Sequence, residues 1–388
     1  MTAAHSLAVG CGFPAGDHHL RMANRRRIRP SFCAAAAPAA LDRLEVMRVS
    51  ARESFVKGIS FSKCKDEDIS LAKALLLAAA EDEAFVAFDR RRDVLSFYLE
   101  RADSVSATAM SLEEPKAGFG FESCPDTIPL SGKTISEWIA ELDSISKQVE
   151  AELESDSLSR DIIGSHLVKV FESRGFKRCP AEEADPKFSY LHSVLSSGCG
   201  SSILLGIIYI EVYKRLGITL GGYRIGNDLW IWPQTWDPEE LFKVSSGGGS
   251  PPGRTLEIAT NRDIIGIALS DLIKVHWKRA SRMNRGLRLT SPLRPASGPL
   301  KVPLLRPQDL KLAVMASERL LVLQPHNWAL RRDHGMLLFY SKRYREAVQE
   351  LSICMAFAPA EEAEVLEHFV EKLHLMRIES SWKSFAVL

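Results

Sequence analysis

The sequence predicts an α+β protein of 388 residues, in which a helical N-terminal part precedes a buried helix with a small antiparallel sheet, and helical hairpins follow. In the first third of the chain, apolar residues recur at spacings of three and four, which is typical of helices. Further along, a segment that is apolar on nearly every side precedes short runs of β-branched and aromatic residues. Near the end, matching residues stand 34 positions apart, which indicates a helical repeat.

The first fifty residues differ in composition from the rest of the chain. They hold seven arginines and three acids, and the tract 34–40 is nearly all alanine. A basic, acid-poor composition rich in small residues is typical of an organelle transit peptide, whereas a secretory signal needs an apolar central block. We therefore expect residues 1–50 to be a transit peptide for a plastid or mitochondrion, cleaved near Cys33–Ala34, with a disordered basic tail as the alternative.

Composition excludes several classes of function. The net charge of +1 provides no global attraction to nucleic acid or to an anionic membrane. Seven scattered cysteines without a C-x-x-C pair argue against a disulfide framework and a zinc site. No apolar run approaches the roughly 18 residues of a membrane helix. Because phosphate-binding glycine loops and metal-spaced clusters are also missing from the sequence, we expect no cofactor and no metal.

Residues 51–132 are predicted to form an N-terminal helical region and a linker. Between Asp66 and Arg101, apolar residues follow helical spacing, so we expect one or two amphipathic helices there. The segment 104–132 is rich in proline and glycine and has little periodicity, which indicates the linker.

The next domain is predicted at residues 133–270. Thr134 and Glu137 have the spacing of a capping box at the start of a helix. A second helix is predicted over Asp161–Arg174. The segment Ser202–Leu216 is apolar nearly all round, which predicts a helix that is buried on every side.

Strands are predicted after this helix, because β-branched and aromatic residues alternate there with turn residues. We expect a small, mainly antiparallel sheet packed on the buried helix. Its tryptophans, Trp230, Trp232 and Trp236, are expected to serve as packing, although an exposed one there could anchor a partner. The candidate strands are 218–226, 227–233, 240–244 and 255–259.

A repeat marks the last domain, predicted at residues 307–388. Ala313 and Ala347 stand 34 positions apart, as do Pro325 and Pro359, and this is the period of tetratricopeptide repeats. These repeats are helical hairpins that commonly bind other proteins, so a protein partner is expected.

Within the second copy of the repeat, Gly335 is expected to let two helices approach closely, Tyr344 and Ala347 to pack between them, and Pro359 to close the second helix. Solenoids usually need at least three units to bury a continuous core. The two copies must therefore dock on neighbouring helices, for which Ile264–Arg279 and Glu361–Leu375 are the candidates.

A basic connecting segment is predicted at residues 271–306. From Leu272 to Gln308 the chain has nine basic residues and no acid, a pattern that can bind phosphates. Aromatic residues that could stack on bases are nearly missing there, so a solvated face, or one paired with the acidic stretch Glu150–Asp156, is the favoured interpretation. The candidate contacts for an anionic partner are Lys278, Arg279, Arg282, Arg285 and Arg288.

Two stretches carry a resemblance to a known family, FESRGFKRCPAEEADPKFSYLHSVLSSGCGSSILLGIIYIEVYKRLG and ASERLLVLQPHNWALRRDHGMLLFYSKRYREAVQELSICMAFAP. Over roughly Ile135 to Leu375 the chain resembles the SirB-type family, in which a transglutaminase-like, papain-like domain is joined to tetratricopeptide repeats. Together with the transit signal, the resemblance implies a plant plastid member in the chloroplast stroma, with the mitochondrion as second choice.

The resemblance also implies where catalytic residues would stand. The parent fold places a cysteine nucleophile at the start of a buried helix, a histidine base on the next strand and an orienting aspartate on the one after. Here Ser202, Asp228 and Val244 fall at these positions. A serine without an adjacent imidazole remains a weak nucleophile, so the sequence predicts a chain without this catalysis.

Cys199 is the alternative nucleophile, because a helix N-terminus next to it would favour the thiolate. No histidine follows it nearby, and His192 fits a packed or surface histidine better. The predicted function is therefore a non-catalytic plastid adaptor or assembly factor. The alternatives are a cysteine-dependent acyl transferase or hydrolase using Cys199, and an RNA- or membrane-associated factor using residues 274–306.

Overall fold

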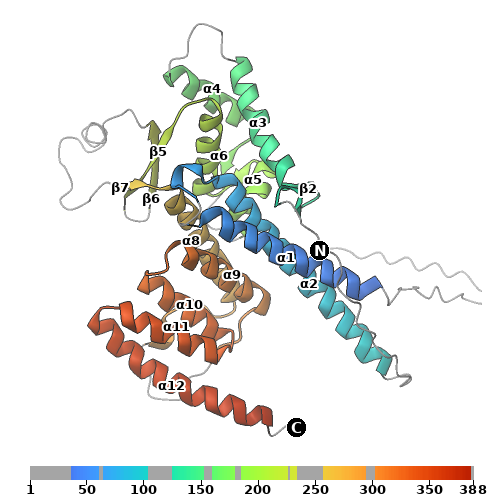
Figure 1. Cartoon of the computed structure of the whole chain (residues 1–388), viewed down its shortest axis with the longest axis vertical. Coiled ribbons are helices and arrows are strands. Elements are labelled where there is room, and N and C mark those ends of the chain that lie inside the picture. Colours follow the sequence, from blue (N-terminus) through green and yellow to red (C-terminus); the bar gives the residue numbers. More distant parts are fainter. Residues whose placement is uncertain are drawn as a thin grey trace, which may run out of the picture.

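The computed structural model describes residues 36–60, 64–103, 125–152, 160–179, 185–225, 228–233, 257–293 and 302–385. A first lobe, residues 125–233 with the strand 257–259, and a second lobe, residues 302–385, lie at opposite ends of the molecule (Figure 1). Between them lie the two N-terminal helices and the helix of residues 261–280. Among the described helices, none combines the length and apolar character that a bilayer span requires.

Two long helices form the N-terminal pair, α1 (Ala36–Ile59) and α2 (Leu71–Asp103), with the short turn η1 (Asp66–Asp68) before α2. They pack along each other, and α2 also contacts helices of both lobes. The first half of α2 is therefore buried on nearly every side, while Val94 and Phe97 near its end are exposed. The expected helical segment is confirmed, and it is one continuous helix.

The start of α1 corrects the predicted extent of the N-terminal segment. We expected residues 1–50 to be a transit peptide or a disordered tail, yet the last fifteen of them belong to α1. Leu44 and Ala51, seven residues apart, are both buried, because α2 offers this stretch an apolar surface to pack on. Residues 1–35, with the predicted cleavage site Cys33–Ala34, lie outside the described residues.

The first lobe begins with a small hairpin that the sequence analysis assigned to a linker. The strands β1 (Pro129–Leu130) and β2 (Lys133–Thr134) pair antiparallel after the turn η2 (Pro125–Thr127). Their turn needs positive φ angles, 49° at Ser131 and 83° at Gly132. The linker prediction is therefore wrong from residue 125 on, and its residues 104–124 lie outside the described part of the chain.

The helix α3 (Ile135–Glu152) begins with the predicted capping box. The Thr134 amide donates to Glu137 Oε2 at 2.6 Å, and the Glu137 amide donates to Thr134 Oγ1 at 3.3 Å. Both bonds satisfy amides that the first turn of a helix leaves unpaired. The Trp138 indole then donates to the Leu130 carbonyl oxygen at 3.0 Å, so the hairpin and α3 form one unit.

A parallel strand pair and a buried helix complete the helical part of this lobe. The predicted buried helix is confirmed, since eight of its residues are buried. The strands β3 and β4 pair in parallel and were not predicted, because two-residue strands carry no periodicity. The elements are α4 (Arg160–Ser173), β3 (Lys177–Arg178), η3 (Pro186–Ser189), α5 (Leu191–Ser197), β4 (Cys199–Gly200) and α6 (Ser202–Arg215).

The predicted antiparallel sheet is present, with strand order β6–β5–β7. Its strands are β5 (Leu220–Ile225), β6 (Asp228–Pro233) and β7 (Glu257–Ala259). In the centre of the sheet, Tyr223 pairs with Trp230 on one side and Ile258 on the other. Both β5 and β6 contact α6, as expected. The candidate strand 240–244 and Trp236 lie outside the described residues.

The helix α8 (Asn261–Ala280) belongs to both lobes. Its start is fixed by a capping box between Thr260 and Asp263, and it contacts α6 and η3 of the first lobe. Its apolar face continues past the predicted division at residue 270, since Leu272 and Ala280 are buried. Residues 271–280 therefore continue this helix and are not a separate connector, which begins only after Ala280 and includes the turn η4 (Ser291–Leu293).

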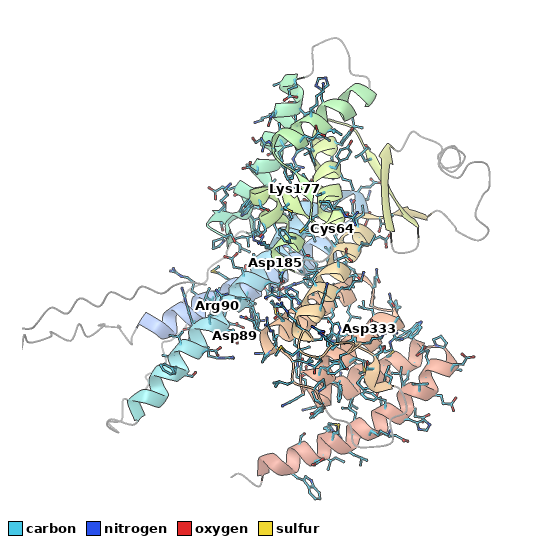
Figure 2. The ribbon with its side chains drawn as sticks, turned by 180° about the vertical axis from the view of Figure 1, so that it is seen from behind. Cys64, Asp89, Arg90, Lys177, Asp185 and Asp333 are labelled. Atoms are coloured by element: carbon cyan, nitrogen blue, oxygen red, sulfur yellow. The ribbon has the colours of Figure 1, made fainter. Side chains whose placement is uncertain are left out.

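The second lobe consists of helical hairpins, as predicted. The helix α8 packs against α9 (Pro307–Leu323), α10 (Trp328–Tyr340) packs against α11 (Tyr344–Phe357), and α12 (Ala360–Phe385) covers α11. The expected neighbours Ile264–Arg279 and Glu361–Leu375 thus flank the repeat on its two sides. In the view from behind (Figure 2), Lys177 and Asp185 lie in the first lobe and Asp333 lies in the second lobe. Asp89 and Arg90 lie on α2.

Candidate functional site

The turn that leads into α6 depends on two glycines. Gly198 ends α5 with a φ of 71°, and a Cβ atom there would lie 2.7 Å from the Gly175 carbonyl oxygen. A Cβ atom on Gly200 would lie 2.6 Å from Val194 Cγ2. Both positions exclude a side chain, one through backbone conformation and close approach and the other through close approach alone. The two glycines therefore determine how the chain enters α6.

Backbone hydrogen bonds hold this entry from both sides. The amides of Lys177 and Cys179 donate to the carbonyl oxygens of Gly198 and Gly200, at 2.8 and 3.0 Å. The Ser201 amide donates to the Phe188 carbonyl oxygen at 3.0 Å. These hydrogen bonds fix the backbone at the start of α6, as the position of a reactive side chain requires.

The residues expected at the catalytic positions are placed as follows. Ser202 is the first residue of α6 and is exposed. Asp228 begins β6 and pairs with Ile225 of β5, so it belongs to the second strand after α6 and not to the next one, because β5 comes between. Val244 lies outside the described residues. In the described part of the chain, no histidine contacts Ser202 through a hydrogen bond.

Cys199, the alternative nucleophile, lies shortly before the start of α6. This cysteine is half-buried in β4, where it pairs with Lys177 of β3. The residue that precedes the first turn of α6 is Ser201, so Cys199 stands outside the helix N-terminus. The use of Cys199 as a nucleophile therefore stays a prediction that chemical labelling can test.

His192 is a packed histidine, one of the two readings the sequence allowed. It lies on α5, buried beside the Trp138 ring at 5.9 Å between centroids. Its Nε2 atom is 3.1 Å from Ser193 Oγ. Burial disfavours the charged imidazolium and so lowers the pKa of His192. Its contacts belong to the core of the lobe rather than to the start of α6.

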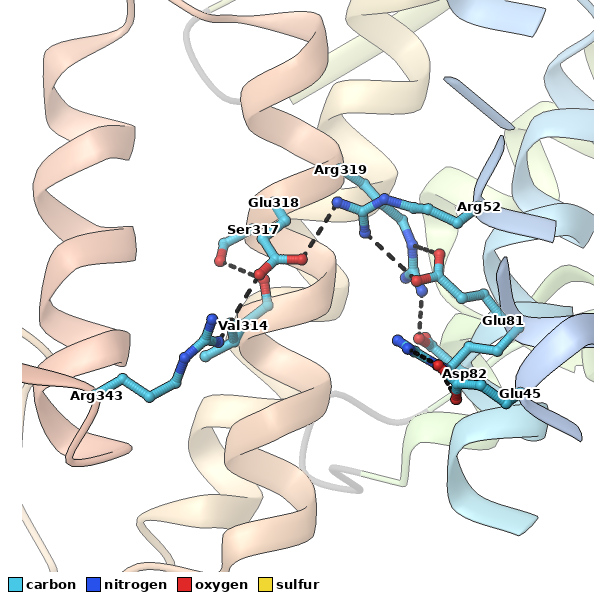
Figure 3. A network of polar contacts seen from close by, with 10 residues as sticks. Glu45, Arg52, Glu81, Asp82, Val314, Ser317, Glu318, Arg319 and Arg343 are labelled. Atoms are coloured by element: carbon cyan, nitrogen blue, oxygen red, sulfur yellow. Dashed lines mark hydrogen bonds and ion pairs between the residues drawn. The ribbon is translucent and has the colours of Figure 1, made fainter. Parts of the chain in front are cut away.

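A second polar cluster joins the two lobes and was not foreseen. Arg319 of α9 is fully buried, and its guanidinium donates from Nε to Glu81 at 2.8 Å and from Nη2 to Asp82 at 2.5 Å. Figure 3 shows both carboxylates reaching it from α2. Arg52 of α1 extends the cluster, with ion pairs of 3.4 Å to Glu81 and 3.2 Å to Glu318 (Figure 3).

The same cluster continues to the first lobe through a tyrosine. The Tyr190 hydroxyl donates to Asp82 Oδ2 at 2.8 Å and lies 3.0 Å from His276 Nε2. Because the only hydroxyl proton of Tyr190 goes to the carboxylate, His276 donates from Nε2. Its Nδ1 atom lies 3.9 Å from Asp309, which accepts a hydrogen bond from Arg279 at 3.0 Å. Helices α2, α8 and α9 and the start of α5 thus share one polar network.

Charge states in this network follow from burial and partners. Burial alone would lower the pKa of Arg319, but the Asp82 and Glu81 carboxylates outweigh it and raise that pKa. Burial, followed by the charge of Asp82, raises the pKa of Tyr190 well above 10. The guanidinium therefore stays charged and the phenol stays protonated at neutral pH. Buried polar contacts of this kind specify how the helices pack against each other.

The sequence carries one signal for this cluster, namely charged residues on helix faces that are otherwise apolar. Glu81 and Asp82 directly follow the apolar run Ala74–Ala80, and Arg319 stands in the equally apolar stretch 313–323. Charged residues on helix faces that are otherwise apolar require buried partners. The sequence by itself does not reveal which distant cation faces these acids.

The residues expected to pack the repeat do so. A Cβ atom on Gly335 would lie 2.6 Å from Leu351 Cγ, so this glycine sets the close approach of α10 and α11. Tyr344 is half-buried, with its ring 6.3 Å from that of Phe339. The remaining residues of the pattern are the fully buried Ala313 and Ala347, and Pro325 and Pro359 in the turns after α9 and α11.

The basic segment is divided by the structure. Arg279 forms an ion pair with Asp309. The expected partner of the basic segment was the acidic stretch Glu150–Asp156. The loop after α8 is held near the end of α10, where the Tyr340 hydroxyl donates to the Arg288 carbonyl oxygen at 3.5 Å. The other candidate contacts for an anionic partner are exposed, namely Lys278, Arg282, Arg285 and Arg288.

Comparison with known proteins agrees with this arrangement. Residues 136–270 match the transglutaminase-like superfamily, and residues 300–371 match the tetratricopeptide repeat. The chain thus holds a region similar to the transglutaminase-like superfamily and a region similar to the tetratricopeptide repeat, which is the domain content implied by its resemblance to the SirB-type family. The first match ends inside α8, consistent with the role of this helix in both lobes.

A curated relative shares part of this sequence. A UPF0162 protein of Xylella fastidiosa (strain Temecula1 / ATCC 700964) is 31% identical over a stretch that covers 29% of this chain and 50% of the relative. The match therefore spans half the length of that relative. No solved structure matches the chain.

Proposed function

We propose that this chain is a non-catalytic adaptor or assembly factor that binds other proteins. The observation that supports the proposal is the start of α6, which lies in the region similar to the transglutaminase-like superfamily and begins with Ser202, the residue that the sequence resemblance puts at the nucleophile position. A serine hydroxyl needs a base to become nucleophilic, and no described histidine forms a hydrogen bond with Ser202. The tetratricopeptide region supports a role in protein binding.

The polar network between the lobes supports a role as a rigid scaffold. The fully buried Arg319 connects α9 to α2, and at the edge of the same interface Lys311 pairs with Asp89 at 3.7 Å. Breaking a buried ion pair costs several kcal/mol, roughly 3 to 5, so the lobes are not expected to move independently. A partner bound to one lobe is thus presented at a fixed distance from a partner bound to the other.

The cysteine-dependent alternative is tested by labelling the whole chain. We expect an alkyne-tagged iodoacetamide to alkylate Cys199 no faster than Cys179, which is also half-buried, when both are quantified by mass spectrometry. The chain is also expected to leave a glutamine-containing peptide unchanged. Rapid stoichiometric labelling that Cys199→Ala removes and Cys179→Ala retains, together with turnover of the peptide, would contradict the proposal.

For the location, we propose the chloroplast stroma, on the arginine-rich and acid-poor composition of residues 1–35. The test is a fluorescent protein fused behind residues 1–35, expressed in plant protoplasts and compared with the same fusion in which the arginines are replaced by glutamate. Chloroplast fluorescence is expected for the first fusion only. Diffuse fluorescence from both would show that the segment is a tail, and mitochondrial fluorescence would select the second choice.

The binding role is tested by proximity labelling in isolated organelles with the full chain fused to a biotin ligase. We expect the same protein neighbours to be enriched by the native chain and by Ser202→Ala, because Ser202 has no chemical role in the proposal. Enrichment of no protein over the ligase alone counts against an adaptor.

A further inference from the structure

Two apolar side chains are left almost fully exposed near the end of α8. Met283 is 78% exposed and Leu304 is 88% exposed, the two highest values among the large apolar residues of the described chain. They lie close together, because the Asn284 side-chain amide donates to the Leu304 carbonyl oxygen at 2.8 Å. Transfer of both side chains from water into an apolar phase is therefore favourable.

The surface that carries this pair is held by the fold. The Asn284 amide donates to the Ser281 carbonyl oxygen at 2.7 Å, and the Arg306 amide donates to the Ala280 carbonyl oxygen at 3.1 Å. The other apolar residues of the same two stretches pack against the core, namely Leu287, Leu289, Leu293, Val302 and Leu305. The exposed pair thus stands out from a backbone whose other apolar side chains are directed inward.

Exposed cations surround the pair. Those of the described chain are Lys278, Arg282, Arg285, Arg288 and Arg306, which we call the cationic surface. Two of them flank Met283 in the chain, and another lies two residues after Leu304. The Tyr340 hydroxyl holds the backbone of Arg288 near the end of α10. One small surface therefore combines two protruding apolar side chains with five positive charges.

This positive charge is not neutralised within the described chain. No acid stands in the segment from Leu272 to Gln308. The acids at its two ends already have partners, since Asp271 pairs with Lys274 at 2.9 Å and Asp309 pairs with Arg279 at 3.0 Å. The chain as a whole is nearly neutral, but a local charge acts on an anion within a Debye length of about 8 to 10 Å.

We propose that this surface binds a lipid bilayer that contains anionic lipids. Met283 and Leu304 enter the boundary between headgroups and acyl chains, and the cationic surface contacts the phosphate and carboxylate groups of the headgroups. Binding in this way holds the chain at a membrane surface without crossing the bilayer. The inference goes beyond the proposed binding of proteins and does not depend on it.

The residues of the surface favour a bilayer over a nucleic acid. Proteins bind single-stranded nucleic acid by stacking bases on aromatic rings. From residue 272 to 308, Trp277 is the only tryptophan, tyrosine or phenylalanine. Its ring is half-buried and packs on Tyr340, with 5.0 Å between ring centroids. Exposed Met283 and Leu304 give bases no such ring.

The same residues favour a bilayer over an acidic protein. A protein interface has a closely packed apolar centre inside a polar rim. In the described part of this segment, Met283 and Leu304 are the only large apolar side chains that are exposed. Two protruding side chains make no such centre, whereas fluid acyl chains adapt to their shape.

The test is sedimentation of the full chain with vesicles of phosphatidylcholine, prepared with and without phosphatidylserine. The native chain is expected to bind the anionic vesicles only, and less tightly as the salt concentration rises. We expect Arg282→Glu with Arg285→Glu to weaken binding at least about tenfold, and Met283→Ser with Leu304→Ser at least about fivefold. The milder pairs Arg282→Gln with Arg285→Gln and Met283→Ala with Leu304→Ala replace a variant whose thermal midpoint falls.

Each variant has a matched control elsewhere on the surface. Lys169→Glu with Lys177→Glu changes the net charge equally, and Val168→Ser with Leu375→Ser removes two other exposed apolar side chains. Both controls are expected to leave vesicle binding within about twofold. If a control weakens binding as much as the variant that it matches, attraction is non-specific and the site is overturned. Failure of the native chain to bind anionic vesicles also overturns it.

Further probes distinguish other occupants of the surface. Single-stranded RNA, polyglutamate and soluble glycerophosphoserine are each expected to bind more weakly than the anionic vesicles. Tighter binding of one of them that depends on Arg282 and Arg285 assigns the surface to that ligand and overturns the bilayer. Full vesicle binding by Met283→Ser with Leu304→Ser overturns the entry of these side chains. Neither the labelling of Cys199 nor proximity labelling enters these measurements, so failure of this inference is distinguishable from failure of the proposed function.

Discussion

Arg319 and Arg377 are both arginines of the second lobe, yet they stand in opposite environments. Arg319 is fully buried between two carboxylates of α2, while Arg377 lines an open groove without a carboxylate partner in the described chain. A buried charge must be compensated within the fold, whereas an exposed one is stabilised by water. The comparison teaches that the first arginine holds the lobes together, whereas the second takes no part in that contact.

The largest effect is expected when the buried arginine is removed. Arg319→Met leaves Glu81 and Asp82 enclosed without their cation, and should lower the free energy of unfolding by roughly 3 to 5 kcal/mol. Urea denaturation of the full chain measures this. The matched control is Arg52→Met, whose partly exposed ion pairs should contribute about 1 kcal/mol or less. Equal losses in both variants would show that burial does not distinguish the two arginines.

A buried histidine should make the second lobe sensitive to acid. His334 lies 2.7 Å from Ser317, whose hydroxyl donates to the Val314 carbonyl oxygen (Figure 3), so the imidazole donates to the hydroxyl from Nδ1. Burial, and then the cations of Arg343 and Arg331, lower the pKa of His334 to about 4 from 6.5. The unfolded chain therefore binds a proton below pH 6.5 that the folded chain accepts only near pH 4.

Because the unfolded state binds more protons in this window, the free energy of unfolding should fall as the pH falls from 6.5 to 4. The contribution of His334 is on the order of 3 kcal/mol over the whole window. His334→Gln should flatten the pH dependence by that amount, as measured by urea denaturation at several pH values. The exposed His368→Gln is the control, and a native-like slope in both variants contradicts the assignment.

Because α10 and α11 pack closely at Gly335, a side chain at this position should lower the free energy of unfolding. The Cβ atom of Gly335→Ala would meet Leu351 at 2.6 Å, and the resulting overpacking should cost about 1 to 3 kcal/mol of unfolding free energy. Gly58→Ala in α1 is the matched control, since nothing lies within 4 Å of that position, and it should be neutral or stabilise the helix by up to about 1 kcal/mol. Thermal unfolding of both variants tests the difference.

If the clash is the cause, Leu351→Ala should relieve it. The double variant Gly335→Ala with Leu351→Ala is then expected to lose less stability than the sum of the two single variants. Strict additivity would mean that the glycine acts through its backbone alone.

The smallest effect on stability is expected in the groove. Arg345→Glu with Arg377→Glu should change the free energy of unfolding by no more than about 0.5 kcal/mol, because cations without a carboxylate partner in the described chain contribute little to the fold. Urea denaturation checks this alongside Arg319→Met. A loss comparable to that of the buried arginine would break the comparison and show that these cations hold α11 and α12 together.

The elements that the sequence predicted well are those with local signals. The capping box of Thr134 and Glu137, the helix α6 and the antiparallel strands all occur, because spacing, caps and turn residues act within a few positions of each other. The start of α1 was missed, since only its packing against α2 distinguishes it from an unstructured basic segment. The strand position of Cys199 was missed because its partner, Lys177, lies 22 residues earlier in the sequence.

The candidate site shows the same division. The sequence placed Ser202 at the start of a buried helix and identified the basic residues around 280–290, but not the cluster around Arg319. Glu81 and Arg319 are 238 residues apart, and no local pattern connects them. The groove was equally invisible, because it forms only where the turn after α10 meets the far end of α12.

By itself, the sequence determined most of the helices, the strands β5 to β7, the cap of α3 and the 34-residue repeat in the last domain. These features arise from interactions between residues that are near each other along the chain. Only the tertiary structure decided which charges are enclosed and which remain exposed, because the environment of a side chain depends on the elements packed around it. The sequence around Arg319 and Arg377 does not show which of the two is enclosed. The packing of α2 against α9 encloses Arg319, and Arg377 stays outside that contact.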